Sequence, residues 1–206
     1  MDSYKLVGSA VLKDLEGYSV GSLTRPQQIV VLVAGLVGAL ASVALLQSEL
    51  GVLSAPEQQL GCDINSLVTC AKSLGSAQGH VLGVPNSVLG IIAFTVLSVI
   101  ALLELLGTQI PRIVVLGVAL GCAAGFGAIG WFIYVSVAQL GVLCPYCMVT
   151  WSAAIWVGCI WMPRAFEPNP NARLLRGYWW LTGIALHLVV LLVLVLTMMD
   201  KIQALL

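Results

Sequence analysis

The stretch Cys144-Pro145-Tyr146-Cys147 lies between two apolar segments, one that ends near Leu140 and one that runs from Met148 to Met162. In a soluble protein, a Cys-x-x-Cys motif close to a βαβ pattern is typical of a thioredoxin-like redox site. The apolar segments on both sides of this motif leave no room for a mixed sheet. We therefore expect its two thiols to lie at the end of a membrane helix.

The composition also predicts a membrane protein. Hydrophobic residues make up 60% of the 206-residue chain and charged residues only 9%, against about 25% charged residues in ordinary soluble domains. The mean hydropathy is +1.03. These values indicate an integral protein of a lipid bilayer. The formal net charge is zero, which gives no reason to expect a nucleic-acid partner.

Five apolar segments come close to the roughly 20 residues that a helix needs to cross a bilayer. They are Ile29 to Leu46, Ser87 to Leu106, Ile113 to Ala138, Met148 to Met162 and Trp179 to Thr197. The fourth is short unless the Cys-x-x-Cys turn itself begins its helix. A cleavable signal peptide is not expected. A polar segment precedes the first apolar segment, and that apolar segment is too long to be the hydrophobic core of a signal peptide. The pattern predicts an all-α integral membrane protein.

The basic residues indicate an orientation. Two of them, Lys72 and Lys201, would lie on one side of the membrane, and the other seven on the opposite side: Lys5, Lys13, Arg25, Arg112, Arg164, Arg173 and Arg176. By the positive-inside rule the N-terminus is then cytoplasmic, and residues 47–86 and 139–147 face outward. Four of the six cysteines fall on that outer side, where disulfides persist.

The Cys-x-x-Cys motif has the sequence of a helix start. Pro145 suits the first helical position, so Cys144 would be the N-cap and Cys147 would lie in the first turn, near backbone N–H groups that stabilise a thiolate. Trp151 follows one turn later on the same face. A structural disulfide, half of a zinc site and inert cysteines remain alternatives. A zinc site lacks an evident fourth ligand, and c-type haem attachment requires histidine where Met148 stands.

A second pair of cysteines, Cys62 and Cys70, lies in the outer loop with seven residues between them. Two thiol pairs on one membrane face suggest a relay by disulfide exchange, and the alternative is a single stabilising disulfide of the loop. Cys122 and Cys159 lie within apolar spans. We expect both to be packing residues, because a free cysteine behaves as a small buried hydrophobe.

Three polar residues lie within or at the ends of the spans, and two of them have both a structural and a functional interpretation. Asn86, at the start of the second span, is either a helix N-cap or a hydrogen-bond donor to a ligand carbonyl. Glu104 is expected to snorkel at the cytoplasmic end of that span. His187 is a functional candidate because it lies within the membrane, but we expect a packed, neutral histidine because its span holds no other ionisable partner.

Taken together, Cys62, Cys70, Ser76, Asn86-Ser87-Val88-Leu89-Gly90 and Cys144-Pro145-Tyr146-Cys147 resemble the vitamin K epoxide reductase family. The resemblance covers about Ile29 to Met162. It implies a four-helix transmembrane bundle around a quinone, to which this chain adds a fifth transmembrane helix. The implied divisions are a cytoplasmic arm (1–26), a catalytic core (27–162) with an outer loop (47–85), a cytoplasmic loop (163–178), and the fifth helix with a short outer tail (179–206).

The resemblance also implies a role for each site residue. Cys147 is expected next to the quinone with Cys144 as its partner, and Cys70 and Cys62 are expected to form the relay. The quinone-binding residues are expected to be Asn86, Ser76 and Trp151, the last in place of the tyrosine of vertebrate members.

This resemblance leads to an expected function. We expect a disulfide-forming enzyme of the bacterial inner membrane that reoxidises a separate DsbA-like thioredoxin-fold protein and reduces a membrane quinone, either menaquinone or ubiquinone. One alternative is reduction of vitamin K epoxide or quinone for a carboxylation cycle. Another is a transporter or scaffold with structural disulfides, although no span is visibly interrupted at mid-membrane, where a transporter would bind its substrate.

Overall fold

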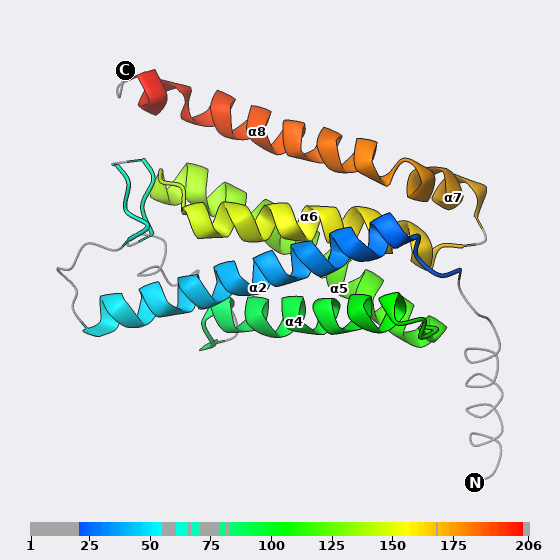
Figure 1. The fold of residues 1–206 in the computed structure, drawn as a ribbon. Coiled ribbons are helices and arrows are strands. Elements are labelled where there is room, and N and C mark those ends of the chain that lie inside the picture. Colours follow the sequence, from blue (N-terminus) through cyan, green and yellow to red (C-terminus); the bar gives the residue numbers. More distant parts are fainter. Residues whose placement is uncertain are drawn as a thin grey trace, which may run out of the picture.

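The computed structural model describes residues 21–54, 61–65, 67–70, 79–80, 83–167 and 169–203. Almost all of them are helical (Figure 1). The helices are α2 (Arg25–Ser54), α4 (Asn86–Leu105), α5 (Arg112–Tyr134), α6 (Pro145–Ala165), α7 (Pro170–Gly177) and α8 (Trp179–Gln203), and α5 continues into one π-helical segment, η3 (Val135–Leu140). Within the described ranges, the only β-pairing is an isolated bridge.

Five of these helices are long and apolar enough to cross a membrane, as the sequence predicts. The first differs most from its predicted bounds, because α2 continues to Ser54 and not only to Leu46. The fourth reaches 21 residues because it begins at Pro145 and continues to Ala165. The protein is therefore an all-α, multi-pass membrane protein.

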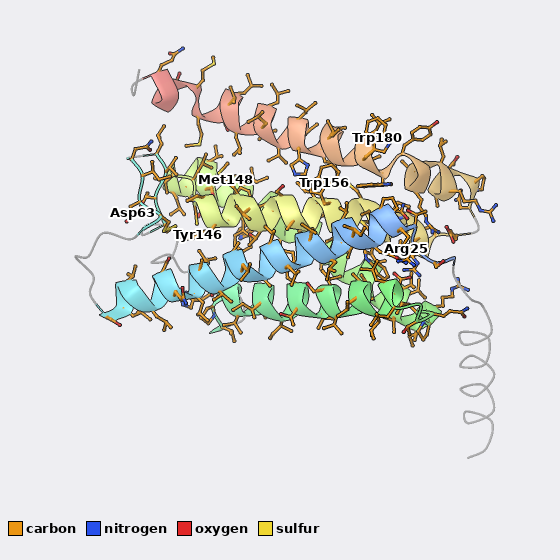
Figure 2. The ribbon with its side chains drawn as sticks, viewed as in Figure 1. Arg25, Asp63, Tyr146, Met148, Trp156 and Trp180 are labelled. Carbon is orange, nitrogen blue, oxygen red and sulfur yellow. A yellow bond between two sulfur atoms is a disulfide. The ribbon has the colours of Figure 1, made fainter. Side chains whose placement is uncertain are left out.

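The helices α2, α4, α5 and α6 form a bundle, and α8 runs along its outside (Figure 1). We call the end that holds the start of α6 the cysteine end, and the opposite end, where α6 finishes, the arginine end. Asp63 and Tyr146 lie at the cysteine end and Arg25 at the arginine end (Figure 2).

Small residues bring the helices close together, as is usual in membrane bundles. A Cβ atom added to Gly38 of α2 would lie 2.6 Å from the ring of Phe94 on α4. One added to Gly158 of α6 would overlap Phe126 of α5. In the same way, a Cβ atom added to Gly183 of α8 would overlap the ring of Trp156 on α6. Helix α8 therefore packs closely against the bundle.

The arginine end is closed by a buried ion pair. Nη2 and Nη1 of Arg164 lie 2.7 and 3.1 Å from the two carboxylate oxygens of Glu104, and both side chains are only 1% exposed. Arg164 also donates from Nε to the carbonyl of Gly21 and lies 4.7 Å from the ring centre of Trp161. The expectation that Glu104 snorkels is wrong, because α6 supplies a cation that pairs with it inside the bundle.

His187 of α8 packs against α6, as expected. Its ring centre lies 5.2 Å from that of Trp156. One ring nitrogen lies 2.8 Å from the hydroxyl oxygen of Ser152, and the other lies 2.7 Å from the carbonyl oxygen of Gly183. His187 thus fixes the register of α8 on α6.

Candidate redox site

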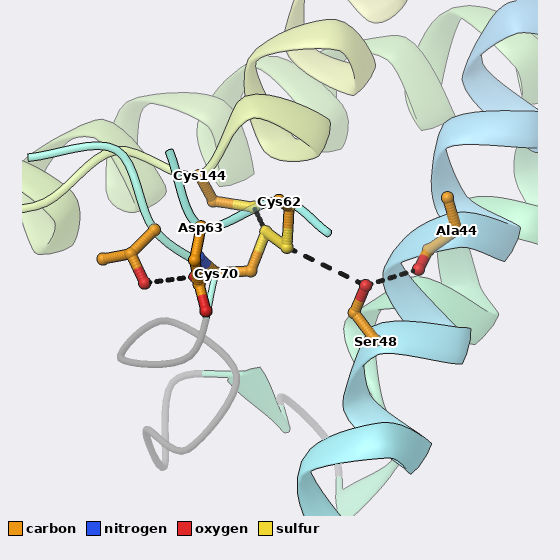
Figure 3. The surroundings of a disulfide bond; sticks show 7 residues. Ala44, Ser48, Cys62, Asp63, Cys70 and Cys144 are labelled. Carbon is orange, nitrogen blue, oxygen red and sulfur yellow. Dashed lines mark hydrogen bonds between the residues drawn. A yellow bond between two sulfur atoms is a disulfide. The ribbon is translucent and has the colours of Figure 1, made fainter. Parts of the chain in front are cut away.

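The loop at the cysteine end carries a disulfide between Cys62 and Cys70, whose Cα atoms are 5.9 Å apart (Figure 3). Both cysteines are buried. Asp63 holds the loop in shape, because one of its carboxylate oxygens accepts hydrogen bonds from the hydroxyl of Thr69 and, at 2.9 Å, from the backbone N–H of Cys70. The loop therefore presents a closed disulfide in a defined position.

The same loop is fastened to the chain just before α6. Val68 and Leu143 form a parallel bridge. The N–H of Leu143 donates to the carbonyl of Leu67 at 2.8 Å, and the N–H of Thr69 donates to the carbonyl of Leu143 at 3.0 Å. Because Leu143 directly precedes Cys144, these backbone bonds set the loop disulfide against the Cys-x-x-Cys motif.

The result is a contact between the two cysteine pairs. The sulfur of Cys70 lies 3.4 Å from the sulfur of Cys144 (Figure 3). On its other side, the sulfur of Cys62 lies 3.9 Å from the hydroxyl of Ser48 on α2. Cys144 and Cys147 are not joined in a disulfide, so a closed loop disulfide lies beside an open Cys-x-x-Cys pair.

The start of α6 favours a thiolate at Cys144. Cys144 is the N-cap, with extended backbone angles, and Pro145 is the first helical residue, as the sequence predicts. A hydrogen bond from the Cys147 side chain lowers the pKa of Cys144, and so do the backbone N–H groups of Cys147 and Tyr146. Burial and the negative charge of Asp63 oppose this shift without reversing it. The cysteine that contacts Cys70 is thus the one whose thiolate form is favoured.

A large cavity lies inside the bundle next to the second thiol. Its volume is about 1050 Å³, and Cys147, Asn86 and Trp151 all line it. It extends from the cysteine end as far as Val114 near the start of α5, and most of its wall is apolar. This volume is at the upper end of the range for small-molecule sites, so the cavity suits a ligand with a ring and a long apolar tail.

Glycines of α5 help to keep the cavity open. Gly117, Gly121 and Gly125 line the wall at a four-residue spacing, which places them on one helix face. A Cβ atom added to any of them would meet nothing within 4 Å.

The remaining predicted residues fall in different places. Asn86 is the first residue of α4 and Pro85 occupies the N-cap, so the N-cap interpretation of Asn86 is wrong. Ser76 lies outside the described residues. Cys122 and Cys159 lie on α5 and α6 among apolar side chains, although Cys122 also lines the cavity.

Sequence reasoning missed a polar group of the cavity wall, Glu49, which is 6% exposed. The predicted end of the first span at Leu46 placed Glu49 in a loop. A signal was nevertheless present, because Ser42, Leu45 and Glu49 follow the three- and four-residue spacing of one helix face, and all three line the cavity.

Comparison with known proteins supports one family. A search of curated proteins finds no match to this chain. The sequence model of the vitamin K epoxide reductase family, by contrast, matches residues 29–162, which span α2 to α6 and include both cysteine pairs. Members of this family are membrane oxidoreductases that act on thiols and quinones. The chain, with its five membrane helices and its two cysteine pairs in contact, belongs to the vitamin K epoxide reductase family.

Proposed function

We propose that the protein forms disulfides: it oxidises a separate thioredoxin-fold protein of the DsbA type and passes the electrons to a membrane quinone. The observation that carries this proposal is the 3.4 Å contact between the sulfurs of Cys70 and Cys144, with Cys147 lining a cavity of about 1050 Å³. One cysteine pair is thus within exchange distance of the other, and the second pair reaches a site for an apolar ligand.

The loop pair meets the protein partner. A thiolate of the partner attacks Cys62 and breaks the Cys62–Cys70 bond, which forms a mixed disulfide and releases Cys70 as a thiolate. The second partner thiol then displaces Cys62, so that the partner leaves oxidised and both loop cysteines are reduced. Cys62 is the point of attack because Cys70 faces Cys144.

The Cys-x-x-Cys pair receives these two electrons. The thiolate of Cys70 attacks Cys144 of an oxidised Cys144–Cys147 pair and releases Cys147, and Cys62 then displaces Cys144 from Cys70. The loop disulfide is closed again and Cys144 and Cys147 are thiols, which is the arrangement of the present structure. Quinone in the cavity accepts the two electrons and two protons, which restores the Cys144–Cys147 disulfide.

Two residues of the cavity wall are assigned to quinone binding. The Asn86 amide donates a hydrogen bond to a quinone carbonyl, and the Trp151 indole packs against the ring. Deleting the indole removes a large contact surface, so Trp151→Ala raises the quinone KM more than Asn86→Ala does. Ser76 is proposed as a third quinone-binding residue, on the basis of the sequence alone.

The proposed orientation follows from the positive-inside rule. Arg112 begins α5, Arg164 lies in the last turn of α6, and Arg173 and Arg176 lie in α7, all at the arginine end. That end then faces the cytoplasm, and the cysteine end faces the periplasm of a bacterial inner membrane, where a DsbA-type partner can reach the loop.

The test is a trapping experiment on the assigned pair of sulfurs. In the Cys62→Ala/Cys147→Ala double variant, both resolving thiols are absent, so mild oxidation should link Cys70 to Cys144, detected by peptide mass spectrometry under non-reducing conditions. The matched control is Cys70→Ala/Cys147→Ala, in which Cys62 and Cys144 should link far less.

Turnover then tests the direction. The parent protein in lipid nanodiscs should reduce menaquinone or ubiquinone when supplied with a reduced DsbA-type protein, and Cys144→Ala and Cys147→Ala should not. Equal amounts of disulfide-linked product in both double variants would contradict the assignment of Cys70 as the loop cysteine that reacts with Cys144. Full quinone turnover by Cys147→Ala would remove the proposed function, and absence of any turnover by the parent would favour a transporter or scaffold.

A further inference from the structure

A carboxylate stands in the cavity wall at the cysteine end. Glu49 is near the end of α2, its side chain is 7% exposed, and it lines the same cavity as Cys147 and Asn86. A carboxylate in an apolar membrane helix is costly, and such groups are functional candidates for this reason. The electron route described above makes no use of it.

Two hydrogen-bonding groups connect Glu49 in opposite directions. The hydroxyl of Ser87, which follows Asn86 and also lines the cavity, donates to Oε2 of Glu49 at 3.3 Å. Nε2 of His80 lies 2.7 Å from Oε1 of Glu49, and the His80 side chain is 42% exposed to solvent. A continuous row of polar groups therefore runs from solvent to the cavity, formed by His80, Glu49 and Ser87.

The inner oxygen of this carboxylate is buried beside His80. Oε1 of Glu49 lies 2.7 Å from Nε2 of His80, a distance at which a proton can pass between the two groups. Within the described residues, Oε1 accepts no hydrogen bond from any other group.

We propose that His80, Glu49 and Ser87 form a proton path from the solution at the cysteine end to the quinone cavity. This inference rests on the proposed function. Quinone reduction takes up two protons for the two electrons that Cys144 and Cys147 supply, and the thiols release two protons as their disulfide forms. The path returns protons from the solution to the cavity, so the overall reaction consumes none.

The other ionisable groups near this path have different partners. On the loop, Asp63 is engaged by Thr69 and Cys70. On α6, Cys144 faces Cys70, while Cys147 and Tyr146 pack on the same cluster. The one acid of α4, Glu104, is paired with Arg164 at the arginine end. Of the described residues that line the cavity, Glu49 is the one carboxylate, and His80 connects it to solvent.

The test compares pH profiles of quinone reduction. Parent protein, Glu49→Gln and His80→Ala, each full length in lipid nanodiscs, are supplied with dithiothreitol and menaquinone over the pH range in which carboxyl and imidazole groups titrate. At each pH, the kcat of a variant is divided by the kcat of the parent. This ratio cancels the pH dependence that the thiols contribute, because the parent and the variants contain the same thiols. We expect a loss of about 100-fold at neutral pH, the lower end of what a positioned proton donor contributes.

This loss should shrink as the pH falls, because free acid in solution then replaces the path. The quinone KM should stay unchanged, and added imidazole should restore part of the rate of His80→Ala. Asp200→Asn is the control, since it removes an exposed acid at the end of α8 that does not line the cavity, and it should match the parent.

Each outcome separates the two proposals. A ratio of variant to parent kcat that stays constant with pH, or an unchanged kcat in both variants, overturns the proton path. In that case quinone reduction by the parent still supports the proposed function. A parent protein that reduces no quinone removes both. If Glu49→Gln fails to fold, the exposed His80→Ala decides alone, by the pH dependence of its rate and by its rescue with imidazole.

Discussion

Removing the Arg164 guanidinium should destabilise the protein more than any other charge deletion at the arginine end. Arg164 and Glu104 are each 1% exposed and share two hydrogen bonds of 2.7 and 3.1 Å. Arg164→Met therefore leaves the Glu104 carboxylate buried without its cation. Breaking a buried pair from one side typically costs about 3–5 kcal/mol, and we expect a loss of that size in the free energy of unfolding.

Replacing both partners should cost much less than the sum of the single changes. In Glu104→Leu/Arg164→Met no charge is left buried, and apolar replacement of a whole buried pair is often neutral or stabilising. The assay is reversible unfolding of each variant in one detergent, followed as a double-mutant cycle. Arg176→Met is the control, because the Arg176–Glu167 pair is 15% and 14% exposed and so less buried than the Arg164–Glu104 pair, and its loss should cost less. Equal losses in Arg164→Met and Arg176→Met, or additive losses in the cycle, would refute the reasoning.

Three further predictions concern the redox site. Asp63 raises the pKa of Cys144, so Asp63→Asn should lower that pKa further and move the pH profile of Cys144 alkylation to lower pH; a shift to higher pH would contradict this. Asn86→Ala should raise the quinone KM by about tenfold, the equivalent of a lost hydrogen bond to a buried group, and an unchanged KM would place the ring elsewhere. Cys122→Ser and Cys159→Ser together should keep most of the turnover, and its loss at normal expression would show that these thiols take part.

The membrane spans could be predicted because their signals are local. Length and hydropathy identify all five helices. The start of α6 is identified by Pro145, the residue directly after Cys144. The end of α2 was harder to place, since Glu49 interrupts the apolar pattern although the helix continues to Ser54. A carboxylate paired across the bundle is compatible with a membrane helix, and hydropathy alone does not detect that pairing.

The contacts that define the site connect distant parts of the chain. Cys70 and Cys144 are 74 residues apart, and Glu104 and Arg164 are 60 apart. Residue spacing predicted each cysteine pair, because the members of a pair are close in sequence. It did not predict which sulfur of one pair meets the other pair, since that depends on the bridge between Val68 and Leu143.

The position of Cys144 as an N-cap explains how two adjacent thiols can serve two different partners. An N-cap residue lies outside the helical path, and Cys144 has φ −96° and ψ 120°, so its side chain is free of the face that Cys147 occupies one turn into α6. Cys144 can then contact Cys70 while Cys147 lines the cavity, and the hydrogen bond between their side chains keeps them within reach of each other. If Cys144 lay inside the helix instead, both sulfurs would share one face, and a pair facing the cavity would be withdrawn from the loop. The extended backbone at Cys144 is therefore the local feature that lets one cysteine pair join a disulfide at the surface to a ligand site inside the bundle.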